Sequence, residues 1–263
     1  MRAVILAAGY ATRMYPLTEH QPKPLLPVGR RVVLDWTMEE LQRLPGLTDI
    51  ALVSNAKFAA QFDAWIAKRK QSWPVPVRLL NDGSTTDERR LGAIRDLLLT
   101  IEQAGATEPL LVTAGDHITD WDLRALCAFG ELRAPAASVA AYRLPDIREA
   151  SRFGVIEVDR DARIVHCEEK PQQPRSDLAM ICLYYLPPDV FPRLQEYLAT
   201  GQNADVPGHF IVWLSRQEPV YGWPTGGKYF DIGTLETYHA TCAALASQVS
   251  TTRTTRTTRG GAG

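Results

Sequence analysis

The chain has 263 residues, with 29 Lys and Arg against 30 Asp and Glu, so its formal net charge is −1. A near-neutral chain lacks the basic excess that a nucleic-acid or acidic-membrane binder needs, so we expect neither nucleic acid nor membrane as a partner. Hydrophobic residues at 45% and charged residues at 22% are typical of a globular protein with a sizeable core. No apolar run approaches the roughly 18 residues that cross a membrane, and we expect a cytoplasmic protein.

The two ends of the chain differ from its body. The apolar part of Met1–Gly9 has only about seven residues, which favours a first β-strand over a signal peptide. The last stretch carries Arg253, Arg256 and Arg259 and no acid; without them 26 basic residues face 30 acidic ones, a net charge of −4. Its low-complexity Thr/Arg/Gly composition predicts a disordered tail over residues 246–263.

Short apolar runs alternate with longer amphipathic segments in the first half. The runs predict strands over Ala3–Ala8, Ile50–Ser54, Val77–Leu80, Leu110–Thr113 and Ala137–Tyr142. The segments between them predict helices over Val33–Leu44, Phe58–Lys70, Glu88–Gln103 and Trp121–Leu132. Such alternation implies right-handed crossovers, and therefore an α/β protein. We expect a Rossmann-like three-layer α/β/α fold with a mostly parallel, mixed central sheet.

The pattern changes from Gly154 onward. A hairpin is expected over Val155–Val158 and Ile164–Glu168, followed by a strand over Ala179–Tyr185. The remaining predictions are helices near Asp189–Leu198 and Phe210–Arg216, short strands around Val220 and Phe230, and a last helix from about Leu235. Because no linker-like segment separates the halves, we expect a single domain over residues 1–245.

The loop after the first strand is the segment most suited to an anion. In an open α/β sheet, ligands bind outside the carboxyl ends of the strands. Gly9 permits close backbone approach, and small Ala11 and Thr12 leave amide groups accessible. Arg13 and Lys23 supply two cations, each of which contributes on the order of 4 kcal/mol to an anion at about 4 Å and an effective dielectric near 20. The loop therefore predicts a phosphate site.

The whole string from Leu6 to Val28 resembles the signature L-A-A-G-x-G-T-R-L-x-P-L-T…P-K-x-L-x-P-V of the sugar-1-phosphate nucleotidyltransferases, also called nucleotide-sugar pyrophosphorylases. Their best-known short members are the glucose-1-phosphate thymidylyltransferases. The chain departs from the signature at Ala11, where glycine is usual, and at Met14, where leucine is usual. The resemblance implies that Arg13 and Lys23 are catalytic, and that the nucleotide contacts come from Leu6, Ala8, Gly9, Ala11, Thr12, Arg13, Lys23, Asn81 and Gly92.

Two aspartates follow strand-like runs far apart in the chain. Asp116 ends Leu110-Leu-Val-Thr-Ala-Gly-Asp, and Asp231 precedes a Gly-Thr turn in Lys228-Tyr-Phe-Asp-Ile-Gly-Thr. Two carboxylates facing a triphosphate would repel it unless a divalent cation lay between them, which favours Mg²⁺ held by oxygen ligands. The family uses the same motifs as its metal-binding aspartates, so the resemblance implies Mg²⁺ as the cofactor.

The acceptor side of the resemblance lies in the second half. Phe153-Gly-Val-Ile-Glu and Glu168-Glu-Lys-Pro match the family pair (Y/F)-G-V-(V/I)-E and E-E-K-P. The match implies that Lys170 binds the sugar phosphate, Glu169 accepts from a sugar hydroxyl, and Gly154 makes a close backbone contact. The resemblance covers about residues 1–240, with a nucleotide-binding part over residues 1–145 and a sugar-phosphate-binding part over residues 146–245.

Two departures leave the substrates open. Gly92 follows no Gln-Pro-x-x-x motif, so the base is open, and Ile181 and Cys182 replace the typical Thr-Gly, so the sugar is open. No hexapeptide repeat of a left-handed β-helix follows, so an acetyltransferase extension is not expected. Members of the family often form dimers or tetramers, which leaves a homo-oligomer open.

The implied reaction converts an NTP and a sugar 1-phosphate to an NDP-sugar and pyrophosphate. Three alternatives stay open at this point. The same chemistry could act on a non-sugar phosphomonoester, as in a phosphocholine-type cytidylyltransferase. A nucleotide-sugar-dependent glycosyltransferase could use Asp120-Trp-Asp122 or Asp159-Arg-Asp161 as its Asp-x-Asp metal motif. A non-catalytic subunit could sense nucleotide-sugar.

Overall fold

The computed structural model of the chain describes residues 1–254. Within that range, nine strands form one mixed sheet in the order β10-β9-β11-β6-β1-β4-β5, with β8 pairing to β11 and β12 to β8. The strands of this sheet are β1 Arg2–Leu6, β4 Ile50–Ser54, β5 Val77–Asn81, β6 Leu110–Ala114, β8 Ala137–Arg143, β9 Gly154–Val158, β10 Ile164–Glu169, β11 Leu178–Leu186 and β12 Val220–Thr225.

The centre of the sheet is parallel, as the alternating pattern predicts. β1 pairs in parallel with β4 and β6, and β4 pairs in parallel with β5. β11 then runs antiparallel between β6 and β8, so that β8 does not continue the parallel series after β6. The pairing of β11 with β8 is irregular between Ile181 and Tyr184, which leaves Cys182 and Leu183 in a bulge.

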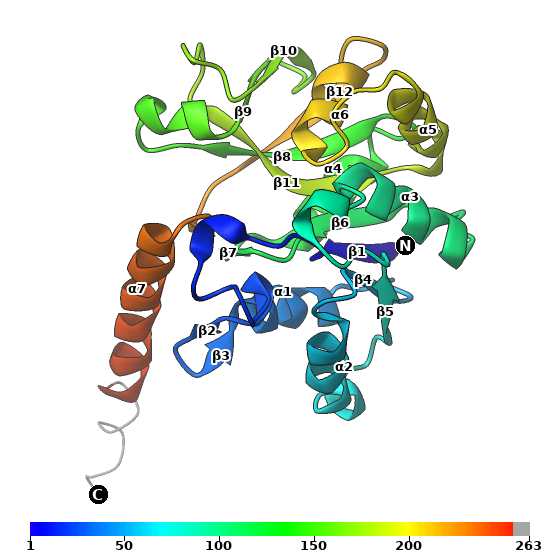
Figure 1. Ribbon diagram of the computed structural model, residues 1–263. Coiled ribbons are helices and arrows are strands. Elements are labelled where there is room, and N and C mark those ends of the chain that lie inside the picture. Colours follow the sequence, from blue (N-terminus) through cyan, green and yellow to red (C-terminus); the bar gives the residue numbers. More distant parts are fainter. Residues whose placement is uncertain (255–263) are drawn as a thin grey trace, which may run out of the picture.

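Helices cover both faces of the sheet (Figure 1). α1 Val33–Gln42, α2 Ala59–Ala67 and α4 Leu123–Glu131 contribute to one buried cluster, and α3 Ala93–Ala104, α5 Phe191–Ala199 and α6 Pro207–Leu214 contribute to the other. β1 faces both clusters, because Ala3 and Ile5 pack into the first and Val4 into the second. The expected three-layer α/β/α fold is therefore confirmed.

A third buried cluster joins the two ends of the chain. Met14 and Leu26, from the loop after β1, pack there with Ile232 and Tyr238. Tyr238 belongs to α7, Leu235–Thr254, and its hydroxyl donates to the backbone oxygen of Pro27 at 2.7 Å. Of the tail expected over residues 246–263, α7 includes the part up to Thr254, and residues 255–263 lie outside the described residues.

Two short antiparallel ribbons lie outside the main sheet; the strand expected around Phe230 belongs to one of them, and their other strands were not expected from the pattern. β2 Pro27–Val28 pairs with β3 Arg31–Val32, and β7 His117–Thr119 pairs with β13 Tyr229–Asp231. The chain also forms short 3-10 turns: η1 Thr12–Met14, η2 Lys23–Leu25, η3 Lys70–Ser72, η4 Asp87–Arg89, η5 Ile147–Arg152 and η6 Pro188–Val190. Among the described residues, no helix combines the length and apolar character that crossing a membrane requires.

Two helices start elsewhere than the periodicity predicts. α3 begins at Ala93 instead of Glu88, because Gly92 adopts a φ of 92° and is approached closely by the backbone of Ala204. A Cβ at Gly92 would lie 2.8 Å from the carbonyl carbon of Ala204, so a glycine is required at this position. α6 begins at Pro207, earlier than the expected Phe210, since proline in the first helical turn has a preset φ and needs no amide hydrogen.

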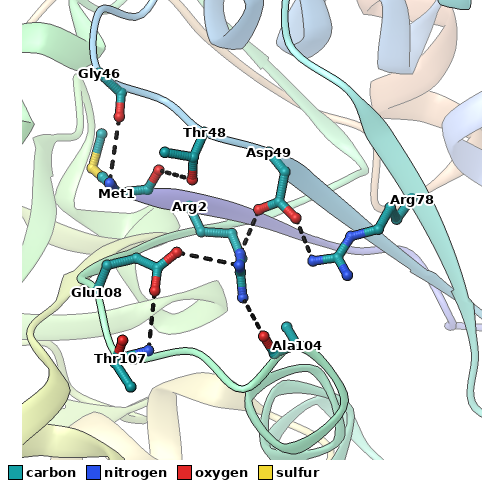
Figure 2. Close-up of polar contacts among 9 residues, drawn as sticks. All are labelled: Met1, Arg2, Gly46, Thr48, Asp49, Arg78, Ala104, Thr107 and Glu108. Carbon is teal, nitrogen blue, oxygen red and sulfur yellow. Dashed lines mark hydrogen bonds and ion pairs between the residues drawn. The ribbon is translucent and has the colours of Figure 1, made fainter.

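Charged residues tie together the amino ends of the parallel strands (Figure 2). The carboxylate of Asp49, just before β4, accepts hydrogen bonds from Arg2 in β1 and Arg78 in β5. Arg2 also pairs with Glu108 at 3.2 Å and donates to the backbone oxygen of Ala104 at 3.1 Å. This cluster lies at the sheet edge opposite the carboxyl ends of β1 and β6.

Candidate active site

A cavity of about 610 Å³ opens at the carboxyl ends of the parallel strands. Its walls come from the loop after β1, the ends of β5 and β6, the start of α3 and the segment that enters α6. This is the edge at which open α/β sheets bind ligands. The expected nucleotide-site residues that line it are Leu6, Ala8, Gly9, Ala11, Thr12, Arg13, Lys23 and Gly92, and Asp116 lines it as well.

The loop after β1 is held in shape by local contacts. Ala11 has a left-handed backbone with φ 50° and ψ 40°, a conformation that glycine adopts more readily. The Oγ1 of Thr18 donates to the backbone oxygen of Ala11 at 2.7 Å, and fully buried Met14 anchors the following turn. Arg13 is exposed and, within the part of the chain that the structure describes, makes no ion pair. Its guanidinium is therefore available to a ligand.

Lys23 and Asp116 form an ion pair at the cavity wall. The Nζ of Lys23 lies 2.7 Å from Oδ2 of Asp116, and the lysine side chain is 14% exposed. Burial alone would raise the pKa of Asp116, but the charge and hydrogen bond of Lys23 outweigh it and hold that pKa below its usual value. The pair therefore keeps an ionised carboxylate and an ammonium side by side at the end of β6.

The β7–β13 ribbon brings the second aspartate beside the first. Asp231 is paired in register with His117, and the backbone nitrogen of Ile232 donates to the backbone oxygen of Asp116 at 3.3 Å. Burial raises the pKa of Asp231, and the negative charge of Asp116 raises it further. Arg152 offsets part of this repulsion from 3.4 Å. Two residues separated by more than a hundred positions thus form one acidic pair.

The acidic pair has the chemistry of an Mg²⁺ site completed by substrate. Mg²⁺ prefers oxygen ligands, and in phosphate-transfer sites one or two carboxylates hold it together with waters and substrate phosphates. Among the described residues, no three acidic, histidine or cysteine groups lie close enough to hold a metal by themselves. Asp116 and Asp231 repel each other through the space between them, so a cation there would lower the energy of both. Asp116 and Asp231 therefore fit a Mg²⁺ ion.

The expected acceptor residues lie outside the lining of this cavity, at the ends of β9 and β10. The Glu169 side chain is only 8% exposed, and burial raises its pKa although Lys170 lies 3.8 Å away. Its carboxylate fits between two glycines. A Cβ at Gly154 would lie 2.7 Å from its Oε2, and a Cβ at Gly208 would overlap it. Gly208 is thus a close neighbour of Glu169 that the sequence motifs do not single out.

Asn81 does not line the cavity, although the next residue, Asp82, does. It is exposed, and its Oδ1 accepts from the backbone nitrogen of Gly83 at 2.9 Å, as in an Asx turn. The wall near it is formed by residues that the motifs did not single out: Asp82, Asp87, Arg90, Asp96, Asn203 and Asp205. Asp82 directly follows β5, so the rule that strand ends carry ligands could have found it.

A protein-family model described as nucleotidyl transferase matches residues 2–248. The chain belongs to the nucleotidyl transferase family. It is 27% identical over 252 residues to a glucose-1-phosphate adenylyltransferase from Clostridium novyi, covering 90% of this chain and 64% of the relative. It is 29% identical over 251 residues to one from Thermotoga maritima, covering 90% and 58%. The chain therefore spans about three fifths of the length of these relatives.

Two solved structures of nucleotide-sugar enzymes have a similar fold. A proposed glucose-1-phosphate thymidylyltransferase from Bacillus anthracis, in complex with sucrose, superposes with a TM-score of 0.81 at 23% identity, over 93% of this chain and 94% of the other. A UDP-glucose pyrophosphorylase complexed with UDP-glucose superposes with a TM-score of 0.76 at 21% identity, over 94% and 98%. At these identities the likeness bears on the fold, and it agrees with the mixed three-layer sheet.

Proposed function

We propose that the chain transfers the nucleotidyl group of an NTP to a sugar 1-phosphate, giving an NDP-sugar and pyrophosphate. The observation that carries the proposal is that Arg13, Lys23 and Asp116 line one cavity, and that Asp231 lies outside this lining but interacts electrostatically with Asp116 and Lys23. Phosphoryl transfer is accelerated chiefly by positioning and charge neutralisation, and these groups provide both.

The chemical step is an in-line displacement at the α-phosphorus. A phosphate oxygen of the sugar 1-phosphate forms the new bond, and the bond from the α-phosphorus to the bridging oxygen breaks, with its electron pair leaving on pyrophosphate. The nucleophile is already ionised at pH 7, so no residue has to remove a proton. Mg²⁺ held by Asp116 and Asp231 would neutralise phosphate charge and polarise the α-phosphoryl group.

The side chains have separate tasks in this reaction. Lys23 already donates to Asp116, and its ammonium retains two further N–H donors for phosphate oxygens. Arg13 stabilises the leaving pyrophosphate. Its guanidinium is exposed on the loop that lines the cavity, where phosphate oxygens can reach it. Lys170 binds the acceptor phosphate, and Glu169 accepts from a sugar hydroxyl. Residues 1–145 supply most of the nucleotide part and residues 146–245 most of the acceptor part. The segment entering α6, which lines the cavity, is the exception.

The Asp-x-Asp motifs do not favour a glycosyltransferase. Asp122 caps α4 by accepting from the backbone nitrogen of Arg124 at 3.0 Å, and Asp120 accepts from that of Lys228 at 2.7 Å. Asp159 accepts from the backbone nitrogens of Asp161 and Arg163, each at 2.9 Å, in the turn before β10. These carboxylates cap turns and a helix. A purely sensing subunit is not favoured either, since the charged positions for chemistry are all present.

Pyrophosphate release tests the proposal. We expect the full chain with MgCl₂ to release pyrophosphate from at least one of ATP, CTP, GTP, UTP and dTTP when a suitable sugar 1-phosphate is added. Asp116→Asn should lower this rate by at least about 100-fold, because it removes the carboxylate charge that would hold Mg²⁺ for the phosphates and that pairs with Lys23. A panel of common hexose, amino-sugar and pentose 1-phosphates that gives no release with any NTP would overturn the proposal. Phosphocholine in the same assay tests the alternative acceptor.

A further inference from the structure

The cavity has two ends of opposite charge. Arg13 and Lys23 lie on the side of the loop after β1, whereas the side formed by β5, α3 and the segment entering α6 carries acids: Asp82, Asp87, Asp96 and Asp205. Arg90 is the cation among these acids, and it is already bonded to Asp87 at 2.8 Å and to Asp205 at 2.7 Å. On the proposed function, on which this inference rests, a triphosphate binds toward the cations. The uncharged base then lies at the acidic end.

Asp96 is the acid at this end of the cavity that has a buried oxygen without a hydrogen-bond partner among the described residues. It lies in the first turn of α3, lines the cavity and is only 4% exposed. Its Oδ1 is buried and has no hydrogen-bond partner in the part of the chain that the structure describes. Buried polar groups are nearly always hydrogen-bonded, because an unpaired one is unfavourable by several kcal/mol of lost hydration. A carboxyl placed this way on a cavity wall is suited to meet a donor from a ligand.

The neighbours of Asp96 add acceptors and no free donor. Asp82 accepts from the backbone nitrogen of Ser84 at 2.7 Å and from its hydroxyl at 2.8 Å. Asp205 is bonded to Arg90. Burial raises the pKa of Asp96 to about 7, and the charges of Asp82 and Asp205 contribute to the rise.

Nucleobases differ in how they match such a surface. Cytosine, adenine and guanine carry an exocyclic amino group that donates hydrogen bonds, and carboxylates in proteins accept from such groups. Uracil and thymine have no amino group: O2 and O4 accept and N3–H is their one ring donor, so they offer fewer donors to these carboxylates when Asp96 is ionised, at a pH above about 7. Leaving buried polar groups unpaired is the strongest basis for discrimination between similar ligands.

We propose that Asp96, with Asp82 and Asp205, selects an NTP whose base carries an exocyclic amino group, namely CTP, ATP or GTP, over UTP and dTTP. The names of the similar proteins do not decide this, since they include adenylyl, thymidylyl and UDP-linked members. Asp96 is a specificity-determining residue in this proposal and takes no part in the bond-making step.

Binding of the five NTPs to the full chain by titration calorimetry in MgCl₂ at about pH 8, where Asp96 is mostly ionised, tests the proposal without an acceptor. We expect at least one amino-bearing NTP to bind about tenfold or more tightly than UTP and dTTP, a difference of about 1.4 kcal/mol. Asp96→Asn has nearly the same shape but turns one acceptor into a donor. It should therefore reduce the preference by at least about fivefold, by improving the fit of the carbonyl-bearing bases. Asp82→Asn should shift the preference in the same direction.

Asp63→Asn is the matched control, since Asp63 is exposed on α2, outside the cavity lining, and should leave the preference unchanged. Equal or tighter binding of UTP or dTTP to the unmodified chain would overturn the inference while leaving the triphosphate site intact. An unchanged preference in both Asp96→Asn and Asp82→Asn, with binding retained, would remove the assignment to these residues. Binding of none of the five NTPs would overturn the proposed function and this inference together.

Discussion

The ammonium of Lys23 and the carboxylate of Asp116 are joined by a 2.7 Å hydrogen bond that spans 93 positions of sequence. Lys23 is presented by η2, whose Leu25 is buried and whose Pro24 packs near Gly115. Asp116 follows β6 at the tight turn into β7. Both groups are thus held by the scaffold before any ligand arrives, which lowers the reorganisation needed to bind a charged phosphate.

Replacing Lys23 tests the phosphate-binding role directly. Lys23→Gln keeps a hydrogen-bond donor and removes the charge, so we expect kcat/KM for the nucleotide to fall by about 100-fold or more. The pKa of Asp116 should rise at the same time, since Lys23 is what lowers it. Steady-state pyrophosphate release measures the first effect. Lys68→Gln, at an exposed position after α2, is the control and should behave as the unmodified chain.

Gly208→Ala tests whether Glu169 serves the acceptor. The added Cβ would overlap the Glu169 carboxylate and force it out of its place between two glycines. We expect KM for the sugar 1-phosphate to rise by about tenfold or more while KM for the nucleotide stays within about twofold. Gly226→Ala is the matched control, because nothing lies within 4 Å of its Cβ position. Equal effects on both substrates would argue against an acceptor role for Glu169.

Asp96 should make stability depend on pH. Its folded-state pKa of about 7 exceeds the unfolded value of about 3.9, so between these values the folded chain binds more protons. The associated stability is fully present below about pH 4 and is lost as the pH rises to about 7. The amide of Asp96→Asn does not titrate, so the variant lacks this loss. Its unfolding free energy minus that of the unmodified chain should therefore be higher at pH 8 than at pH 5, by about 2–3 kcal/mol.

Urea unfolding of both chains at the two pH values measures this difference. Any effect of the substitution that does not depend on pH is the same at both values and cancels. Asp63→Asn should show no such difference, because Asp63 is exposed. An identical effect of Asp96→Asn at pH 5 and pH 8 would mean that the carboxyl titrates normally in the folded chain.

The charge cluster in Figure 2 should stabilise the fold and should have no effect on the reaction. Asp49 is the shared acceptor of Arg2 and Arg78, and its side chain is 12% exposed. Asp49→Ala leaves the Arg78 side chain, which is 46% exposed, without its carboxylate partner and leaves Arg2 with Glu108 alone as an acidic partner among the described residues, so we expect a loss of about 1–3 kcal/mol in unfolding free energy. KM for the nucleotide should not change, since the cluster lies at the opposite sheet edge. A raised KM in the folded variant would contradict this separation.

Elements whose structure depends on neighbouring residues in the chain could be predicted from local sequence. The run Ala3–Leu6 alternates between the two faces of the sheet, and the loop from Gly9 to Lys23 carries its small residues, prolines and cations within one segment. For this reason the first strand, the cavity-lining loop and the strand end before Asp116 could all be predicted. Asp96 had a signal too, since it is an acid among the buried positions of α3.

Contacts between distant segments could not be predicted in the same way. β11 enters between β6 and β8, a choice that depends on how three strands pack and that no local pattern encodes. The late start of α3 depends on the backbone of Ala204, and the acidic end of the cavity depends on Asp205, which meets Arg90 across 115 positions. Gly208 was missed because its importance comes from the carboxylate of Glu169 on another element.

The position of bond cleavage tests the central claim most directly. NTP labelled with ³²P at the α-position, and separately at the γ-position, is incubated with the full chain, MgCl₂ and the sugar 1-phosphate that supports pyrophosphate release. The account predicts that the α-label appears in the NDP-sugar and the γ-label in pyrophosphate, in equal amounts and only when the sugar 1-phosphate is present. Release of the γ-label as inorganic phosphate, or an α-label that never enters an NDP-sugar, would contradict it.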